Sequence, residues 1–290
     1  MHSKKISDYA LDTVIYVILI AMGLSTLLPF ITVLSKSVSE EWAITSGKVN
    51  LFPVGFQLDT LQYVVTNHQF LHALLISALV AVAGTLASLL ITAMTAYPLS
   101  KRELPGVGII IILFVFTMMF NGGIIPNYLL IRQLDLIDNL GSLVLPALIS
   151  VFNMLVIKSY FESLPPSLEE SAKIDGARNY TILFRIILPL SGPVLATIGL
   201  FYAVYYWNDY FNPMLYINST SLKPLQLYLQ DIVMNADSSS FKMSAEDMMN
   251  VPAEGVRAAT VIASTVPILL VYPFLQKYFI KGVLIGSVKG

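Results

Sequence analysis

Long uncharged apolar runs constrain the fold of this chain more than any other feature. Each is close to the roughly 20 residues that a helix needs to cross a bilayer, and the interiors of the second to sixth runs contain no Asp, Glu, Lys or Arg. A lipid interior offers the backbone no water, so a helix, which satisfies its own hydrogen bonds, is favoured. The runs do not alternate as the strands of a membrane barrel would. We therefore expect an all-α polytopic membrane protein with six transmembrane helices. The runs lie at Leu11–Leu34, Leu71–Leu99, Val107–Phe120, Leu140–Ile157, Leu188–Trp207 and Ala258–Phe279.

The composition argues against several other classes of protein. Charged residues make up 12% of the chain, against about 25% in soluble domains, and the mean hydropathy is +0.73. A net charge of −1 provides no basic surface, so we expect no nucleic-acid partner. The chain contains no Cys, which removes disulfides and thiolate chemistry. His68 and His72 stand outside any HExxH pattern, so we expect no metal site.

The distribution of positive charge predicts how the chain crosses the membrane. The first run is too long for the apolar region of a signal peptide, so it is interpreted as the first span. With the N-terminus inside, eleven of the 17 Lys and Arg residues fall in inner segments and six in outer ones. We expect both termini to be cytoplasmic and a single transmembrane domain to occupy residues 1–290. Asn121–Gly123 and Pro126 interrupt the third run before Leu130, which indicates either a simple helix end or a broken helix.

One charged stretch, SLEESAKIDGARNYTILFRIILP at Ser167–Pro189, falls between the fourth and fifth runs on the predicted cytoplasmic side. Ser167 and Glu170 fit the S-x-x-E capping box of a short helix, and Gly176 suits the left-handed residue that ends one. Asn179 fits the cap of a second helix. We call this predicted helix pair, Ser167–Pro189, the elbow. Its pattern fits a solvated loop and also a surface shaped for docking a partner.

Sequence patterns for catalysis are missing from the chain. It contains no G-x-x-x-x-G-K-[ST] phosphate loop and no G-x-S-x-G nucleophile motif, so no catalytic residue is assigned. Uncharged spans also disfavour proton-coupled carriers, which place ionisable groups at this depth, although a sodium site of neutral oxygens stays open. A stand-alone secondary transporter or facilitator, and a non-transporting membrane scaffold, are the alternatives to a subunit driven by a partner.

The elbow, Ser167–Pro189, resembles the EAA loop of the membrane subunits of ABC importers. Glu170-Ser171-Ala172, then Asp175-Gly176-Ala177, then Ile187-Leu188-Pro189 follow the pattern E-A-A-x-x-D-G-A and x-L-P, with Ser171 where Ala is usual. The stretches Trp207–Pro213 and Lys281–Gly290 are similar to patterns of the MalG-type carbohydrate permeases. The family-like core covers about residues 71–280. Met243–Ala258 is similar to a subgroup that handles larger oligosaccharides, including the alginate importer.

The resemblance implies a permease subunit of an ATP-driven carbohydrate importer in the bacterial inner membrane, with an oligosaccharide or polysaccharide of acidic, alginate-like kind among the candidate substrates. It implies as partners a second homologous permease subunit, a cytoplasmic ABC ATPase dimer and an extracytoplasmic solute-binding protein. ATP and Mg would be bound by the ATPase, so no cofactor is expected in this chain. In the family the loop is a coupling helix that docks on the ATPase. The residues that would couple are Glu169, Glu170, Ser171, Ala172, Asp175, Gly176 and Ala177.

Aromatic residues gather where the fifth run ends. Phe201, Tyr205 and Asn208 share one face of a helix by their spacing. An interfacial aromatic belt or ordinary packing explains such residues, and the alternative is that they line the path of a sugar. The candidate pathway residues are Phe201, Tyr205, Trp207, Asn208 and Asp209.

Overall fold

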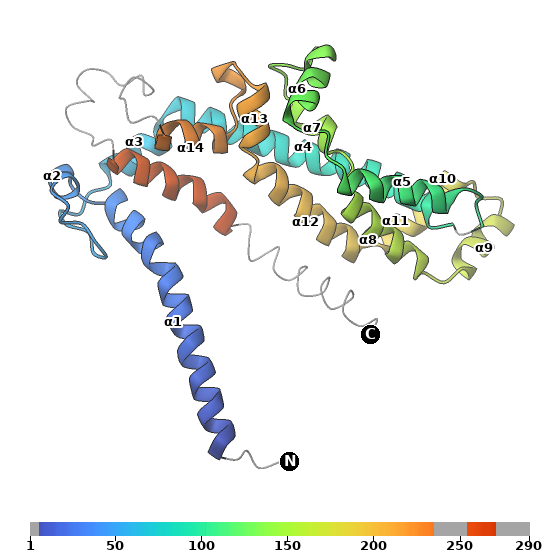
Figure 1. The fold of residues 1–290 in the computed structure, drawn as a ribbon, viewed down its shortest axis with the longest axis horizontal. Coiled ribbons are helices and arrows are strands. Elements are labelled where there is room, and N and C mark those ends of the chain that lie inside the picture. Colours follow the sequence, from blue (N-terminus) through green and yellow to red (C-terminus); the bar gives the residue numbers. More distant parts are fainter. Residues whose placement is uncertain (1–5, 102, 235–253, 271–290) are drawn as a thin grey trace. The chain divides into compact units, whose positions relative to one another are not determined.

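The computed structural model describes residues 6–101, 103–234 and 254–270, and this part of the chain is almost entirely helical (Figure 1). Its one β feature is an isolated antiparallel bridge between Ser39 and Phe56. The helices are α1 (Ile6–Ser37), α2 (Glu41–Thr45), α3 (Asp59–Thr66), α4 (His68–Leu99), α5 (Val107–Met119), α6 (Ile124–Gln133), α7 (Gly141–Val144), η1 (Leu145–Ala147), α8 (Val151–Glu162), α9 (Ser167–Ile174), α10 (Asn179–Ile182), η2 (Leu183–Ile187), α11 (Leu188–Leu190), α12 (Gly192–Asn208), α13 (Phe211–Tyr216), η3 (Thr220–Leu222) and α14 (Leu225–Met234). Residues 254–270 are also helical.

Two helices of membrane-spanning length and three bent helix pairs correspond to the first five predicted runs. Leu11–Ser37 within α1, and α4, are each long and apolar enough to cross a bilayer. Three bent pairs, α5 with α6, Gly141–Ala147 with α8, and Asn179–Leu190 with α12, meet the same test if each pair is one span. The sixth predicted run, and the patterns at Met243–Ala258 and Lys281–Gly290, lie partly or wholly outside the described residues. The helical fold class is therefore confirmed, while six spans and cytoplasmic termini stay predictions.

The third apolar run is broken. Helix α5 ends at Met119, and α6 starts at Ile124 with its axis turned by 112°. Gly123 has a φ of +92°, which side-chain-bearing residues rarely adopt. Its N–H donates to Asn121 Oδ1 over 2.9 Å, which closes the turn locally. The interruption at Asn121–Gly123 is therefore observed, while the assignment of α5 and α6 to one broken span stays a prediction.

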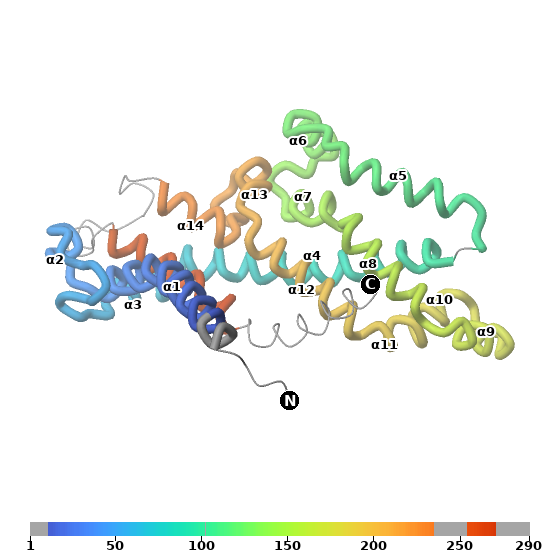
Figure 2. Tube along the Cα trace, turned by 60° about the horizontal axis from the view of Figure 1, so that its bottom comes forward, coloured from blue at the N-terminus to red at the C-terminus, as the bar shows by residue number. Residues whose placement is uncertain are grey.

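The chain divides into two compact units. One comprises Met1–Leu71 and Leu229–Ile268, and the other comprises His72–Tyr228 and Leu269–Gly290. The second unit holds the elbow and the larger buried core, to which α4, α8 and α12 contribute. Figure 2 shows the elbow helices α9 and α10 beside the C-terminal end of α4.

Helices α4 and α12 pack closely because small residues face large ones. A Cβ built on Gly84 would lie 2.8 Å from the Tyr206 ring, so this contact requires glycine. The Tyr206 hydroxyl lies 2.8 Å from Ser88 Oγ, and the Tyr202 hydroxyl lies 2.7 Å from Thr92 Oγ1. The buried aromatic hydroxyls at the centre of this unit therefore have partners, as an apolar interior demands.

The chain departs from a regular α-helix within the elbow, directly before the fifth run. Residues Leu183–Ile187 form a π-helix, and the chain bends by 85° between Asn179–Leu190 and α12. Pro189 and Pro193 flank the bend and lack the N–H groups that a continuous helix would use there. The elbow thus joins α12 through a wide helical turn and a sharp corner.

A carboxylate fastens the loop after α6 to the segment after α13. Asp138 accepts from the backbone N–H of Asn218 over 3.0 Å and of Ser219 over 2.8 Å, and also from the Ser219 hydroxyl. Its own N–H donates to the Tyr216 carbonyl over 2.7 Å. Asp138 has a φ of +59°, a conformation that Asp and Asn tolerate better than most residues. We call this set of bonds the Asp138 clasp.

Candidate functional site

The first elbow helix, α9, begins at a proline rather than at a serine cap. Pro166 is the N-cap residue with φ −58° and makes no side-chain capping bond, while Ser167 is the first helical residue. The Pro166 carbonyl accepts from the N–H groups of Glu169 and Glu170 over 3.0 and 3.1 Å. Proline presets a helical φ, so the helix starts one residue earlier than predicted. The predicted Ser167–Glu170 capping box is therefore wrong.

The end of α9 follows the prediction closely. Gly176 has a φ of +77°. Its N–H donates to the Lys173 carbonyl over 3.0 Å, and the N–H of Ala177 donates to the Ala172 carbonyl over 2.9 Å. These two bonds define the Schellman ending of a helix, in which a left-handed residue satisfies the last carbonyls. Gly176 thereby fixes where α9 stops and how the chain leaves it.

The second elbow helix also starts one residue early. Arg178, with φ −79° and ψ 156°, is the N-cap of α10, and Asn179 is its first helical residue. No side chain caps the helix, so the predicted Asn179 cap is wrong. The Arg178 carbonyl accepts from the N–H of Ile182 over 3.0 Å, which is sufficient to begin the first turn. The two helices of the elbow are nevertheless present where they were predicted.

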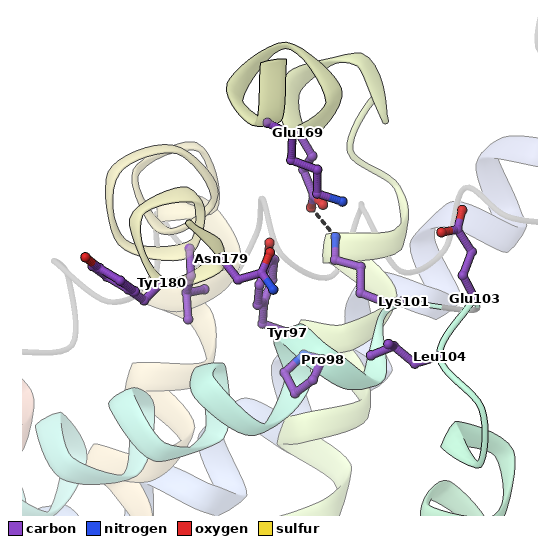
Figure 3. A pocket seen from close by; sticks show the side chains of 10 residues that line it. Tyr97, Pro98, Lys101, Glu103, Leu104, Glu169, Asn179 and Tyr180 are labelled. Atoms are coloured by element: carbon purple, nitrogen blue, oxygen red, sulfur yellow. Dashed lines mark hydrogen bonds and ion pairs between the residues drawn. The ribbon is translucent and has the colours of Figure 1, made fainter. Parts of the chain in front are cut away.

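Two adjacent glutamates of α9 have different surroundings. The side chain of Glu169 is 14% exposed and forms an ion pair with Lys101 Nζ, just beyond the end of α4 (Figure 3). Glu170 is exposed. The Lys101 ammonium also lies 4.6 Å from the centroid of the Tyr97 ring, in a cation–π arrangement. Glu169 therefore ties α9 to α4, whereas Glu170 is available to another molecule.

A cavity of roughly 350 Å³ lies between the end of α4 and the elbow. Figure 3 shows Lys101 extending from α4 toward Glu169, while Glu103 points away. The lining residues are Tyr97, Pro98, Lys101, Glu103, Leu104, Glu169, Lys173, Asn179, Tyr180 and Leu183. The elbow thus rests on α4 over a partly open space, with the ion pair as a charged contact across it.

The outward surface of α9 is mixed in polarity and almost wholly accessible. Ile174 is 86% exposed, an unusual position for a large aliphatic side chain, while Ala172 is 7% exposed and packs against the core. The remaining predicted coupling residues are exposed at Glu170, Ser171, Asp175 and Gly176, and half-buried at Glu169 and Ala177. The prediction omitted Lys101 and Ile174. Ile174 had a detectable signal, because it is an apolar residue next to the charged Lys173 and Asp175.

The candidate pathway residues at the end of α12 fall into separate environments. Tyr205 is 46% exposed. Asn208 is exposed and donates from Nδ2 to the Val204 carbonyl over 3.0 Å. Asp209 accepts from the Asn212 side chain over 2.8 Å and is therefore engaged in the turn to α13. Phe201 and Trp207 are half-buried. The structure keeps Phe201, Tyr205 and Asn208 on one helix, while Tyr202 and Tyr206 pack inward.

Comparisons with known proteins agree on one family. Residues 104–285 match the family described as binding-protein-dependent transport system inner membrane component. The chain is 42% identical to the polygalacturonan/rhamnogalacturonan transport system permease protein YtcP of Bacillus subtilis, over 96% of this chain and 98% of that protein. It is 27% identical to the arabinooligosaccharides transport system permease protein AraQ of Halalkalibacterium halodurans, over 74% of this chain and 72% of that protein.

A solved structure has the same fold along almost the whole chain. It is the crystal structure of a bacterial ABC transporter involved in the import of the acidic polysaccharide alginate. The likeness has a TM-score of 0.89 with 33% identity and covers 96% of this chain and 100% of that chain.

Proposed function

Because this chain belongs to the family of binding-protein-dependent transport system inner membrane components, we propose that it is the permease subunit of an ATP-driven carbohydrate importer. The observation that carries the proposal is the elbow. It presents Glu170 and Ile174 to the outside while the Glu169–Lys101 ion pair holds it on α4. In this proposal the chain crosses a bacterial inner membrane six times with both termini in the cytoplasm, and the elbow faces a cytoplasmic ATPase dimer.

The elbow offers two routes by which closure of the ATPase would reach the membrane. One is electrostatic, through Glu169 and Lys101 to α4. The other is covalent, through α10 and η2 to the bent junction with α12. Since α4 and α12 pack through the Gly84–Tyr206 contact, the two routes converge on one helix pair. A second homologous permease would complete the path, and ATP and Mg would bind in the ATPase rather than in this chain.

The substrate class we propose is an acidic oligosaccharide or polysaccharide delivered by an extracytoplasmic solute-binding protein. Support comes from the relative named for polygalacturonan, a polymer of a uronic acid, and from the transporter that imports the acidic polysaccharide alginate. Phe201, Tyr205, Trp207, Asn208 and Asp209 are the residues proposed to lie along the path. Aromatic faces beside amide groups suit a ring with apolar and hydroxyl-bearing sides.

The test is uptake by proteoliposomes that contain the assembled transporter, with ATP inside and the binding protein outside. We expect oligogalacturonate to be taken up with ATP hydrolysis. Its methyl ester, equal in length but uncharged, should be taken up more slowly. Equal uptake of both compounds contradicts the acidic substrate class. Ion-gradient-driven uptake by this chain alone, without an ATPase, contradicts the importer and favours the secondary transporter. An absence of transport together with stable membrane assemblies would favour a scaffold.

A further inference from the structure

The segment after α1 folds back onto the end of that helix. Ser35 Oγ donates to the Leu51 carbonyl over 2.8 Å. The antiparallel bridge between Ser39 and Phe56 then pairs the segment that leaves α1 with the segment that returns to it. Ser35 and Ser39 are 4% and 1% exposed, so these contacts form a packed junction. We call the returning segment, Leu51–Phe56, the collar.

The collar is apolar and exposed despite being held in place. Its sequence, LFPVGF, contains no charged residue. Phe52 is 81% exposed and Phe56 is 69% exposed. Val54 of the collar packs against the buried residues Ala43 and Ile44 of α2. Helix α2 also carries Trp42, which is 51% exposed and has Lys48 Nζ 5.0 Å from the centroid of its ring. A soluble surface rarely holds several large apolar side chains together in water without covering them.

The length of α1 sets the depth at which the collar lies. The apolar part Leu11–Ser37 has 27 residues, which at about 1.5 Å per residue is about 40 Å of helix. The hydrocarbon core is about 30 Å thick, and the bilayer with its headgroups is about 40–45 Å. A centred helix therefore places Ser37 in the headgroup region. Because Ser35 and Ser39 bond to the collar, the collar lies at that same depth.

We propose that the collar is a lipid anchor, in which Phe52 and Phe56 insert at the boundary between headgroups and acyl chains beside the end of α1. Trp42 lies at the headgroups, where indole rings are enriched. Apolar side chains that enter this boundary typically reach about 5–10 Å into it. The anchor fixes the depth and rotation of α1 in the leaflet where the helix ends. This inference does not rest on the transport function, because it requires only that α1 crosses a bilayer.

The experiment measures tryptophan fluorescence of the full chain in phosphatidylcholine vesicles. In a Trp42→Phe and Trp207→Phe background, Phe52→Trp supplies one reporter on the collar. Lipids brominated near the headgroup end of the chains should quench it more than lipids brominated near the terminal methyl. Met22→Trp, at an exposed position of α1 within the same apolar run, is the matched control and should show the reverse order.

Three results would overturn the proposal, provided that the Met22→Trp control reports a normally inserted α1. One is quenching of the collar reporter by aqueous iodide but by neither lipid, which means that the collar faces water. Another is protection from iodide and from both lipids, which means that a protein surface covers it. A third is loss of lipid quenching when the chain is assembled with its partner subunits. A second measurement uses the Trp207→Phe chain, in which the native Trp42 is the reporter. Lipids brominated near the headgroup end of the chains should quench Trp42 as well.

Discussion

Replacing Lys101 by Met removes the charge that holds Glu169 against the end of α4, while keeping an apolar stem of similar length. The two side chains are 29% and 14% exposed, so the pair is only partly hydrated. The variant leaves the carboxylate of Glu169 half-buried without its cation. We expect α9 to detach from α4 more often, and ATP hydrolysis in the assembled transporter to continue with less transport per ATP.

The size of the effect follows from burial. Exposed ion pairs contribute about 0.2–1 kcal/mol, and removing one partner of a fully buried pair costs about 3–5 kcal/mol. The Lys101–Glu169 pair lies between these limits, so we expect a loss of about 1–3 kcal/mol in the attachment of α9. That corresponds to a roughly 5- to 150-fold shift toward the detached state. Lys101→Met also removes the contact with Tyr97, which is worth about 0.5–1 kcal/mol. Glu169→Gln keeps that contact and should be milder.

The assays are hydrogen exchange in α9 and the ratio of solute transported to ATP hydrolysed. Lys158→Met is the matched control, because Lys158 pairs with Glu162 over 2.9 Å, with exposures of 15% and 19%, and both residues lie in the single helix α8. Both variants lose a similar ion pair, yet only Lys101→Met releases the elbow. If Lys101→Met leaves hydrogen exchange in α9 and the transport ratio unchanged, or if Lys158→Met changes both to the same extent, the reasoning fails.

Three further predictions test the elbow and the clasp. A Cβ on Gly176 would meet nothing within 4 Å, so Gly176→Ala should cost only the left-handed backbone, about 1 kcal/mol, and keep ATPase binding in co-purification. Gly176→Arg adds bulk to the docking face and should lose that binding; equal loss in both variants would assign the effect to strain. Ile174→Ser should leave the thermal stability of the chain unchanged but weaken ATPase co-purification by up to about 1.5–3 kcal/mol, the value of burying an aliphatic side chain, and unaltered co-purification would remove Ile174 from the interface. The Ser219 hydroxyl and N–H lower the pKa of Asp138 below 3.8, so the clasp stabilises the fold above the unfolded pKa and is lost as pH falls through the folded value. Asp138→Asn should therefore lose less thermal stability than the wild type below about pH 4, and identical acid profiles would contradict this role.

The apolar runs and the elbow were predictable because each depends on local sequence. Run length is set by bilayer thickness, and Gly176 is favoured by the left-handed turn that it adopts. The two caps were mispredicted for a local reason as well. Ser167 and Asn179 are good cap residues in general, but Pro166 already had a helical φ and the Arg178 carbonyl began α10. The general preference of a residue type for the N-cap position does not decide which of two adjacent residues begins a helix.

The contacts of the candidate site were not predictable, because they join distant segments. Lys101 and Glu169 are 68 residues apart, and nothing near either one specifies the other. Ser88 and Tyr206 are 118 residues apart, and their contact depends on how α4 crosses α12. The π segment Leu183–Ile187 also has no compositional mark, since four apolar residues and Arg185 are equally compatible with an α-helix. The first two features are set by tertiary packing, and the sequence around the third does not specify it.

The π segment affects how much of a movement of the elbow is transmitted to α12. A π turn contains one residue more than an α turn, because its bonds run from residue i to i+5. Conversion of Leu183–Ile187 to α geometry would advance the chain on one side by about 1.5 Å and rotate it by about 100°. The π segment thus accommodates one extra residue between α10 and α12. A rotation of α10 therefore does not require an equal displacement of α12 along its axis. The movement of the elbow and the movement of α12 can therefore differ in size.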